Sequence, residues 1–272
     1  MARKPATRPA LPVLRDAPRY KEKGADYLFP GERHGGYELC YVDRGPVNVL
    51  VDGAGFAGQT GDLFVFFPKQ EHILWADTRT APNIAGAHFE LPGGAGLWPG
   101  LARLRQGPVR CSARVRDLVA ALLAAGQDDS ARGRLLARVY LAELLLLAPA
   151  APERPAAPSR RVAANGRARL AELAERLMRE RLGEPLRLAD LAGALCVGES
   201  TLRHAFKAAA GRGVMERLGE LRAERARELL RESDCSVTEI AARVGYPTIH
   251  AFSRAFKRLV GMSPGEYSRS VR

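Results

Sequence analysis

The stretch GYPTIHAFSRAFKRLVGMSPGEY, residues 245–267, decides how this chain is interpreted. Residues 249–259 predict a helix, and at about 100° per residue one side of it carries the apolar side chains Phe252, Ala255, Phe256 and Leu259. The other side carries Ile249, His250, Ser253, Arg254 and Lys257. So narrow an apolar seam indicates a helix that docks on its own domain through one side and keeps the other free. Thr248 is expected to cap the helix and to direct backbone N–H groups toward a phosphate-lined partner.

The same pattern occurs earlier in the chain, because residues 188–213 (LADLAGALCVGESTLRHAFKAAAGRG) resemble residues 237–263. Leu191 matches Ile240, and Leu202 matches Phe252. Each copy predicts a short helix, a turn near Gly198 or Gly245, and a second helix, which is a helix-turn-helix. In the first copy the predicted apolar side holds Leu202, Ala205 and Phe206, Gly198 takes the cap position, and the free side holds Ser200, Arg203, His204 and Lys207.

Residues 213–233 (GVMERLGELRAERARELLRES) lie between the two copies and predict one continuous helix. Its apolar stripe comprises Val214, Leu218, Leu221, Ala226 and Leu229. About 18 helical residues span roughly 27 Å, which suits two helices placed about 34 Å apart, one turn of B-DNA. Arg222 falls inside the stripe, so we expect it to be buried and to form hydrogen bonds, without contacting DNA.

The free sides of the two helices carry side chains that can contact DNA. Arg203 and Arg254 match guanine edges, Ser253 can bind a base or a phosphate, and Ile249 can contact a thymine methyl group. The alternative is that these are solvated surface residues, which is the usual explanation for one isolated helix. Two matching helices in a basic segment favour DNA contact, with phosphate contacts outnumbering base contacts.

Charge and composition agree with a polyanionic partner. The 272 residues carry a net charge of +12, with 19 Lys and Arg against 15 Asp and Glu in residues 1–150 (+4) and 23 against 15 in residues 151–272 (+8). The four cysteines are far apart, so we expect neither disulfides nor a zinc knuckle. No apolar run is long enough to span a bilayer, so a cytoplasmic protein without membrane contact is expected.

The pattern before residue 149 differs from the rest. Residues 27–92 contain short β-branched and aromatic runs between turn residues, which predicts an all-β barrel or sandwich. Residues 116–126 and 132–148 predict helices, the second apolar over so wide an arc that it is expected to pack on the barrel and on a second copy of itself. We therefore expect an α+β chain with a first domain at 1–150, a linker at 151–166 that overlaps the Pro-rich region 149–161, and an all-α domain at 167–272.

The motifs LADLA, STLRHAFK, LRAERARELL, VTEIAARVGY and AFSRAFKRLVGMSPGEY resemble the AraC/XylS family of bacterial transcription regulators over residues 167–272. The resemblance implies two helix-turn-helix units, joined by a long helix, that bind adjacent major grooves. It implies base contacts from Ser200, Arg203 and His204 in the first unit and from Ile249, His250, Ser253 and Arg254 in the second. Gly198 replaces the usual Ser cap, and Ser268 stands where an Arg commonly follows the last Tyr.

The segments HGGYELCYVDRGPVNVLVDG, GDLFVFFPKQEH and AHFEL resemble the cupin-like sensor domain that many members of this family carry. In such members a small effector, often a sugar, binds inside the barrel, and a following helical segment forms the dimer. Here the matching helical segment is residues 135–147. The resemblance thus implies a homodimer with a small-molecule effector and double-stranded DNA as partners. If the protein regulates transcription, RNA polymerase is a further expected partner.

Five side chains are candidates for binding the effector. His34, Glu38 and His72 fall where metal-binding cupins place ligands, although Glu32 stands in place of one usual histidine. We favour a polar barrel mouth over a metal site there, and expect no metal and no cofactor. His88 and Trp75 can complete a sugar pocket with polar groups and an aromatic face, although Trp75 is equally compatible with a core role.

Three functions compete. The leading hypothesis is a ligand-responsive transcription regulator that is not an enzyme; the residues leave activation and repression open, and activation is the working expectation. The second is a cupin-type metalloenzyme fused to a DNA-binding module, which stoichiometric metal bound through His34 and His72 would favour. The third is a DNA-repair fusion, which is disfavoured because the chain has no cysteine cluster to hold zinc or to accept an alkyl group.

Overall fold

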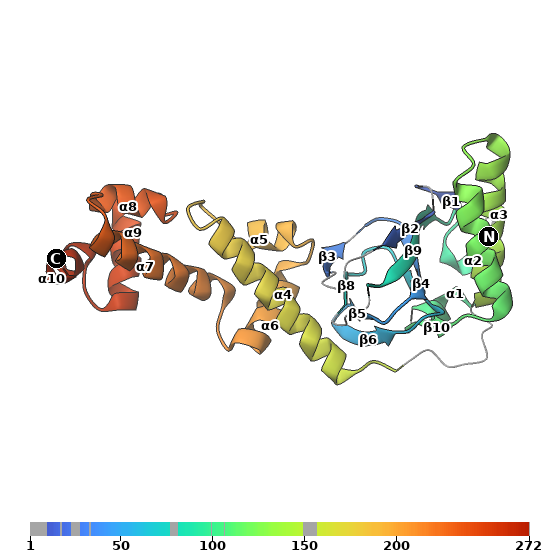
Figure 1. Cartoon of the computed structure of the whole chain (residues 1–272), viewed down its shortest axis with the longest axis horizontal. Helices are drawn as coiled ribbons and strands as arrows, with labels where there is room; N and C mark the ends of the chain where they lie inside the picture. Colours follow the sequence, from blue (N-terminus) through green and yellow to red (C-terminus); the bar gives the residue numbers. More distant parts are fainter. Residues whose placement is uncertain are drawn as a thin grey trace, which may run out of the picture. The chain divides into compact units, whose positions relative to one another are not determined.

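The chain divides into two units, residues 1–166 and residues 167–272 (Figure 1). The structure is a computed structural model. It describes residues 10–16, 18–22, 28–32, 34–76, 81–98, 100–105, 107–148 and 157–271. In these ranges no helix is long and apolar enough to cross a bilayer.

The first unit is built on two antiparallel sheets. The larger has the strand order β1-β9-β4-β7-β10, with β2 also paired to β9, and the smaller has the order β3-β8-β5-β6. The strands are β1 (Val13–Leu14), β2 (Arg19–Glu22), β3 (Leu28–Glu32), β4 (Tyr37–Arg44), β5 (Val47–Val51), β6 (Ala54–Gly58), β7 (Asp62–Phe66), β8 (His72–Trp75), β9 (Asn83–Glu90) and β10 (Val109–Arg110). Among the described strands no ladder joins the two sheets, so the arrangement is a sandwich and the predicted closed barrel is not confirmed.

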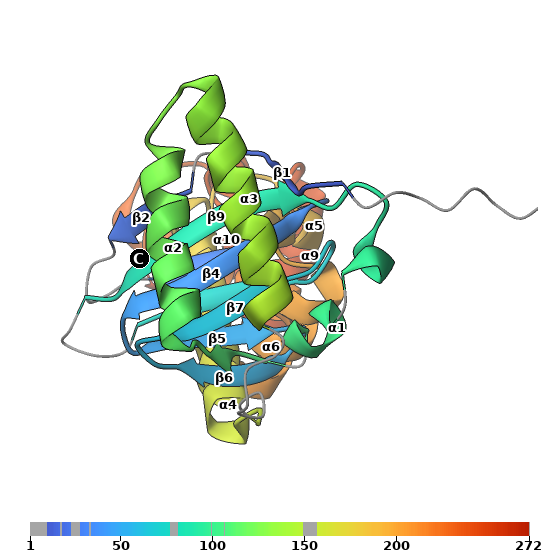
Figure 2. The ribbon, with the colours of Figure 1, turned by 90° about the vertical axis from the view of Figure 1, so that its right-hand side faces the viewer.

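Each face of the larger sheet packs against a different partner. One face meets the smaller sheet through a shared apolar core that includes Val42, Phe64, Val49 and Leu74. The other face is covered by α2 (Ala113–Gly126) and α3 (Ala131–Leu147), which lie across β9, β4 and β7 (Figure 2). The short helices η1 (Ala95–Leu97) and α1 (Leu101–Leu104) connect β9 to β10. The predicted packing of the Leu-rich helix on the β domain is therefore present.

Helix α4 (Arg160–Glu180) begins inside the segment that the sequence assigns to a linker. Residues 149–156 of that segment lie outside the described residues, but residues 160–166 are helical because the prolines end at Pro158 and Ser159 then accepts a hydrogen bond from the backbone N–H of Val162 at 3.4 Å. This first part of α4 packs on the smaller sheet: a Cβ atom at Gly166 would lie 2.8 Å from the Trp75 ring. The start of the helix is thus part of the first unit.

The second unit is entirely helical. It contains α5 (Leu188–Ala194), α6 (Glu199–Ala210), α7 (Val214–Glu232), α8 (Val237–Arg243), α9 (Ile249–Val260) and α10 (Pro264–Val271), after the end of α4. Helices α6 and α9 have 12 residues each, and both end at a glycine in the left-handed conformation, Gly211 and Gly261. The predicted cap is confirmed, because Thr248 Oγ1 accepts a hydrogen bond from the backbone N–H of Ala251 at 3.1 Å. The internal repeat is therefore also a repeat in structure.

The burial of the repeated helices follows the predicted seams except at Ala255, which is half-buried, and at Leu259. Leu202, Ala205 and Phe206 are buried in α6, and Phe252 and Phe256 are buried in α9. Leu259, which the seam places inside, is instead exposed, with 39% of its surface accessible. Its side chain reaches α7 at Gly219, where a Cβ would lie 3.7 Å from Leu259 Cδ1 and no side chain exists to cover it. The expectation for Leu259 was therefore wrong.

Candidate effector site and DNA-binding surface

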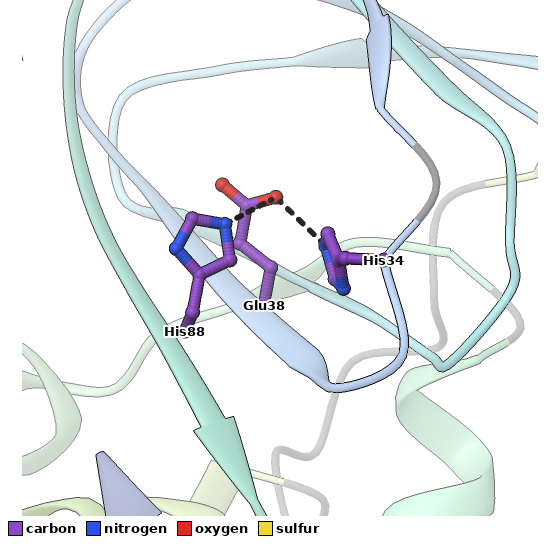
Figure 3. A group of neighbouring side chains, drawn as sticks. All are labelled: His34, Glu38 and His88. Atoms are coloured by element: carbon purple, nitrogen blue, oxygen red, sulfur yellow. Dashed lines mark hydrogen bonds and ion pairs between the residues drawn. The ribbon is translucent and has the colours of Figure 1, made fainter. Parts of the chain in front are cut away.

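Glu38 is the centre of a polar group between the two sheets. It lies on β4 directly opposite His88 on β9, and it is buried. Its Oε2 atom lies 3.4 Å from His34 Nε2, 3.0 Å from His72 Nε2 and 3.6 Å from His88 Nε2. Figure 3 shows the His34 and His88 rings turned toward this carboxylate. The structure therefore brings together four of the five residues that the sequence singles out.

The second ring nitrogen of each histidine has a partner of its own. His34 Nδ1 lies 2.8 Å from the carbonyl oxygen of Gly36, and His72 Nδ1 lies 3.3 Å from that of Gln70. His88 Nδ1 lies 2.8 Å from Asp16 Oδ2, and the backbone N–H of His88 donates to Asp16 Oδ1 at 2.9 Å. Asp16 escaped the sequence analysis because it is separated from His88 by 72 positions and carries no motif.

His72 is packed against aromatic rings. Its imidazole stacks on Phe66 with a centroid distance of 4.0 Å and an interplanar angle of 5°, and the Phe29 ring lies 6.2 Å away at an interplanar angle of 18°. The side chain of His72 is fully buried. Because the ring cannot turn without disturbing this stack, His72 holds the Glu38 carboxylate in one orientation.

The close approach of the Glu38 carboxylate to its histidine partners shifts the pKa values of Glu38, His34 and His88. Burial raises the pKa of Glu38, but its contacts with His34, His72 and His88 outweigh burial and bring that pKa well below its usual value. The Glu38 carboxylate raises the pKa of His34 against the opposing effect of burial. Glu38, opposed by burial and assisted by Asp16, raises the pKa of His88 to about 9. At neutral pH the group therefore carries a carboxylate beside at least one imidazolium.

A cavity of about 420 Å³ opens onto this group. It is lined by Arg15, Asp16, His34, Gly35, Gly36, His88 and Glu90. Its size falls in the range of small-molecule sites, and charged and polar groups line it. Arg15 and Asp16 are held against β9, since the backbone N–H of Arg15 donates to the carbonyl oxygen of His88 at 2.8 Å and the Arg15 side chain forms an ion pair with Glu90.

Trp75 does not join the group. In β8 side chains alternate, and His72 and Leu74 face the larger sheet, so Trp75 faces the opposite side. There it is 1% exposed and packs against Gly166 of α4. Successive side chains of a strand point to opposite faces, so the alternation along residues 72–75 could have shown that Trp75 and His72 face different sides of the sheet.

The side chains that the sequence assigns to DNA contact lie on the outside of the second unit. In α6, Ser200, Arg203, His204 and Lys207 are exposed; in α9, His250, Arg254 and Lys257 are exposed, and Ile249 and Ser253 are half-buried. Ser200 Oγ lies 3.3 Å from His204 Nδ1. Among the described residues, neither Arg203 nor Arg254 forms an ion pair within the chain, whereas Arg225 on α7 pairs with Glu228 at 2.7 Å.

The turns of the two helix pairs differ at one equivalent position. The left-handed residue between α8 and α9 is Gly245, with φ of 77°, and between α5 and α6 it is Cys196, with φ of 53°. Gly198, near which the sequence placed the first turn, has φ of −70° and is the N-cap of α6. The structure thus locates the first turn two residues earlier than its glycine suggests.

Comparison with known proteins gives the same division of the chain. A family model described as an AraC-like ligand binding domain matches residues 19–145, and one described as a helix-turn-helix domain matches residues 191–270. A putative AraC-like transcription regulator of Streptomyces lividans is 45% identical over 82 residues, 30% of this chain and 27% of that protein. The match thus spans only about a quarter of the relative.

A longer match is found with an uncharacterized HTH-type transcriptional regulator, YfiF, of Bacillus subtilis. It is 24% identical over 245 residues, which are 86% of this chain and 76% of that protein. Among solved structures, the C-terminal domain of AraT, a response regulator from Geobacillus stearothermophilus, is 35% identical and covers 37% of this chain and 84% of that chain, with a TM-score of 0.36.

Proposed function

This chain belongs to the AraC/XylS family of transcription regulators, and we propose that it binds double-stranded DNA through α6 and α9 under the control of a small effector held in the first unit. The observation that carries the proposal is the repeated pair of helices, each with a buried apolar side and an exposed basic side. Helix α7 joins the two pairs and, with 19 residues, is about 28 Å long. That length suits two helices placed in successive major grooves.

The DNA contacts proposed are those of the two free sides. Arg203 and Arg254 have no ion-pair partner among the described residues and are available for guanine edges or phosphates. Lys207 and Lys257, near the ends of α6 and α9, are suited to phosphate contacts. Ser200, His204, Ile249, His250 and Ser253 complete the proposed surface.

The effector is proposed to bind in the cavity of about 420 Å³ beside His34 and His88. The polar and charged lining favours a small hydrophilic molecule, and sugars are the first class to screen. Trp75 has no part in this proposal, because its ring faces away from the cavity.

A homodimer is proposed through α3. Leu135, Val139 and Leu146 are exposed by 53%, 39% and 50%, and at about 100° per residue they lie within roughly 40° of one another on the helix. An exposed apolar stripe of this kind favours a protein partner. Activation of transcription in the cytoplasm, with RNA polymerase as a partner, is the remaining part of the proposal.

The test begins with the wild-type chain, which is used to enrich bound duplexes from a randomised DNA library. Binding of an enriched duplex is then measured by fluorescence anisotropy for Arg203→Ala, Arg254→Ala and the control Arg225→Ala, whose side chain is paired on α7. Each recognition variant should weaken binding by about 10-fold or more, because one base contact contributes roughly 1–3 kcal/mol. Equal affinities for all four proteins, or failure to enrich any sequence, would count against the proposal.

A further inference from the structure

We propose that His34, Glu38 and His88 form a binding site for a divalent transition-metal ion. Each residue offers one ligand atom, and the three atoms lie within 4.8 Å of one another (Figure 3). The sequence points to His72 as the third member of such a set, but in the structure His72 instead supports Glu38. The inference rests on the proposed function in one respect: the ion would lie beside the cavity that is proposed to hold the effector.

The spacing of the ligand atoms fits an ion. Zinc-type ions take histidine nitrogen and carboxylate oxygen at about 2.0–2.2 Å, so two ligands at a tetrahedral angle lie about 3.4 Å apart. His34 Nε2 lies 3.4 Å and His88 Nε2 lies 3.6 Å from Glu38 Oε2. Both distances from Glu38 thus match those between two ligands of one ion, and the ligand atoms of His34 and His88 lie within 4.8 Å of each other.

Each ligand is oriented by a second contact. The carbonyl oxygen of Gly36 holds His34 Nδ1, the Asp16 carboxylate holds His88 Nδ1, and His72 contacts Glu38 Oε2 at 3.0 Å. Histidines that bind metals usually donate their other ring N–H to a carboxylate or a backbone carbonyl in this way, which turns the Nε2 lone pair toward the ion. The second contacts of His34, Glu38 and His88 are therefore of the kind that orients ligands in metal sites.

One ligand atom lacks a hydrogen bond. His88 Nε2 is buried and has no hydrogen-bond partner in the described part of the chain, since its distance to Glu38 is too long for one. A buried polar atom without a hydrogen bond destabilises the fold, and such an atom in a native structure is often explained by an ion. A metal bound to His88 Nε2, in exchange for the proton that this nitrogen carries when His88 is an imidazolium, would satisfy it.

The donor set selects the class of metal. Two imidazole nitrogens and one carboxylate oxygen suit zinc, cobalt, nickel or ferrous iron better than magnesium or calcium, which prefer oxygen ligands. Three protein ligands also leave a coordination position for another group. That position can face the cavity, where the carboxylate, hydroxyl or amine of an effector could complete the coordination. The ion would then act as part of a sensor.

The test uses the full chain after treatment with a chelator, titrated with Co²⁺ and followed by visible absorption, with Zn²⁺ binding measured by calorimetry. We expect one ion per chain and at least 10-fold weaker binding in His34→Gln and in His88→Gln. His72→Gln should weaken binding by about 10- to 100-fold without changing the stoichiometry, because it acts through Glu38. The double variant His204→Gln/His250→Gln removes the two histidines of the second unit, so only the cluster histidines remain, and it should bind the metal ion as the wild type does. Its DNA binding is not part of this comparison, because both residues belong to the proposed DNA-binding surface.

Absence of saturable binding to the wild type, or equal binding by the wild type and both His34→Gln and His88→Gln, would overturn the inference. Melting temperatures of the metal-free variants identify a variant that has lost its fold; for such a variant, His34→Asn or His88→Asn provides the same comparison. DNA binding is measured separately on the enriched duplex with and without the ion. A chain that binds DNA but no metal refutes this inference alone, and a chain that binds metal but no DNA refutes the proposed function alone.

Discussion

Arg222 Nη2 donates a hydrogen bond of 2.6 Å to the backbone carbonyl oxygen of Glu184. The same guanidinium contacts the carbonyl oxygen of Leu182 at 3.4 Å and lies over the Tyr246 ring at 5.2 Å. Burial lowers the pKa of this group, although Tyr246 partly opposes the effect. Arg222 thus fixes the turn after α4 against the turn between α8 and α9, and the buried, hydrogen-bonding role expected from the sequence is confirmed.

Replacing this arginine should destabilise the second unit. Arg222→Met keeps most of the apolar volume but leaves the carbonyl oxygens of Leu182 and Glu184 without their donor, which costs about 1–3 kcal/mol in free energy of unfolding. Urea unfolding followed by circular dichroism measures the change, and Arg225→Met on the exposed side of α7 is the matched control. Equal destabilisation by the two changes would show that the buried contacts of Arg222 contribute little.

The turn glycine Gly245 should tolerate no side chain. Its φ is 77°, and a Cβ would lie 2.6 Å from Arg222 Nη2, 2.6 Å from the oxygen of Leu182 and 2.7 Å from that of Glu184. Gly261→Ala is the control, because it has φ of 91° but open space around its Cβ. We expect Gly261→Ala to cost about 1 kcal/mol through backbone strain, and Gly245→Ala to cost clearly more.

Cys196 occupies in the first turn the position that Gly245 occupies in the second, so a change to glycine can be tested there. Because it is a non-glycine residue with φ of 53°, Cys196→Gly should relieve local strain and keep or raise the melting temperature. A melting temperature lowered as far as that of Gly245→Ala would show that the two turns are not equivalent.

DNA affinity should fall steeply with salt. Neutralising each phosphate releases counterions, so the logarithm of the association constant falls linearly with the logarithm of salt concentration. Lys207→Ala and Lys257→Ala should each reduce this slope by about 1 while affecting all sequences alike. The measurement is anisotropy at several salt concentrations. A slope for the wild type near zero would contradict phosphate contact by α6 and α9.

Charge on the exposed face of α3 should break the proposed dimer. Leu135→Glu and Leu146→Glu each place a carboxylate in the apolar stripe, and light scattering coupled to size exclusion should then report a monomer. Ala120→Glu on the exposed side of α2 is the control and should leave the mass unchanged. A monomeric wild type, or a dimer that persists in both leucine variants, would place the interface elsewhere.

The ion pairs of Arg217 should make the second unit sensitive to acid. Arg217 contacts Glu175 of α4 at 2.8 Å, as well as Glu220 and Glu224, each at 3.1 Å. The hydrogen bond from Arg217 lowers the pKa of Glu175 against a smaller effect of burial. A lowered pKa gives stability that is present above the usual carboxyl pKa and is lost as pH falls through the lowered value.

Arg217→Met should therefore lower the melting temperature at neutral pH, and its difference from the wild type should shrink as pH falls below the usual glutamate range. Arg179→Met, which removes the more exposed partner of Glu175, should have the smaller effect. A difference between Arg217→Met and the wild type that stays constant from pH 7 to strongly acidic pH would show that these ion pairs do not account for the stability Arg217 provides.

The second unit was the more predictable half because its signals are local. The spacing of Phe252 and Phe256, the cap at Thr248 and the polar residue Arg222 within an apolar stripe all report on one helix at a time. Leu259 departed from its seam because the neighbouring position on α7 is Gly219, and no periodicity within α9 contains that information.

In the first unit the site depends on pairings between distant segments. Glu38 and His88 face each other through the register of β4 and β9, and Asp16 reaches His88 from near the start of the chain. Residue types suggested that His34, Glu38, His72 and His88 lie together. The fold decides that His72 orients the Glu38 carboxylate, whereas His34 and His88 are placed to share a bound ion with it. A sandwich and a closed barrel differ in whether hydrogen bonds join the edge strands of the two sheets. The residues of a single strand do not specify which strand it pairs with, so the sequence did not distinguish the two folds.

The stack of His72 on Phe66 has a consequence for selectivity. The Glu38 carboxylate is held in place before a ligand binds, so it loses little conformational entropy on binding. The binding free energy is therefore not reduced by ordering this side chain. A carboxylate held in one orientation also fixes the direction from which a ligand must approach it. Ligands whose polar groups do not meet that direction would bind more weakly, so selectivity would follow from geometry.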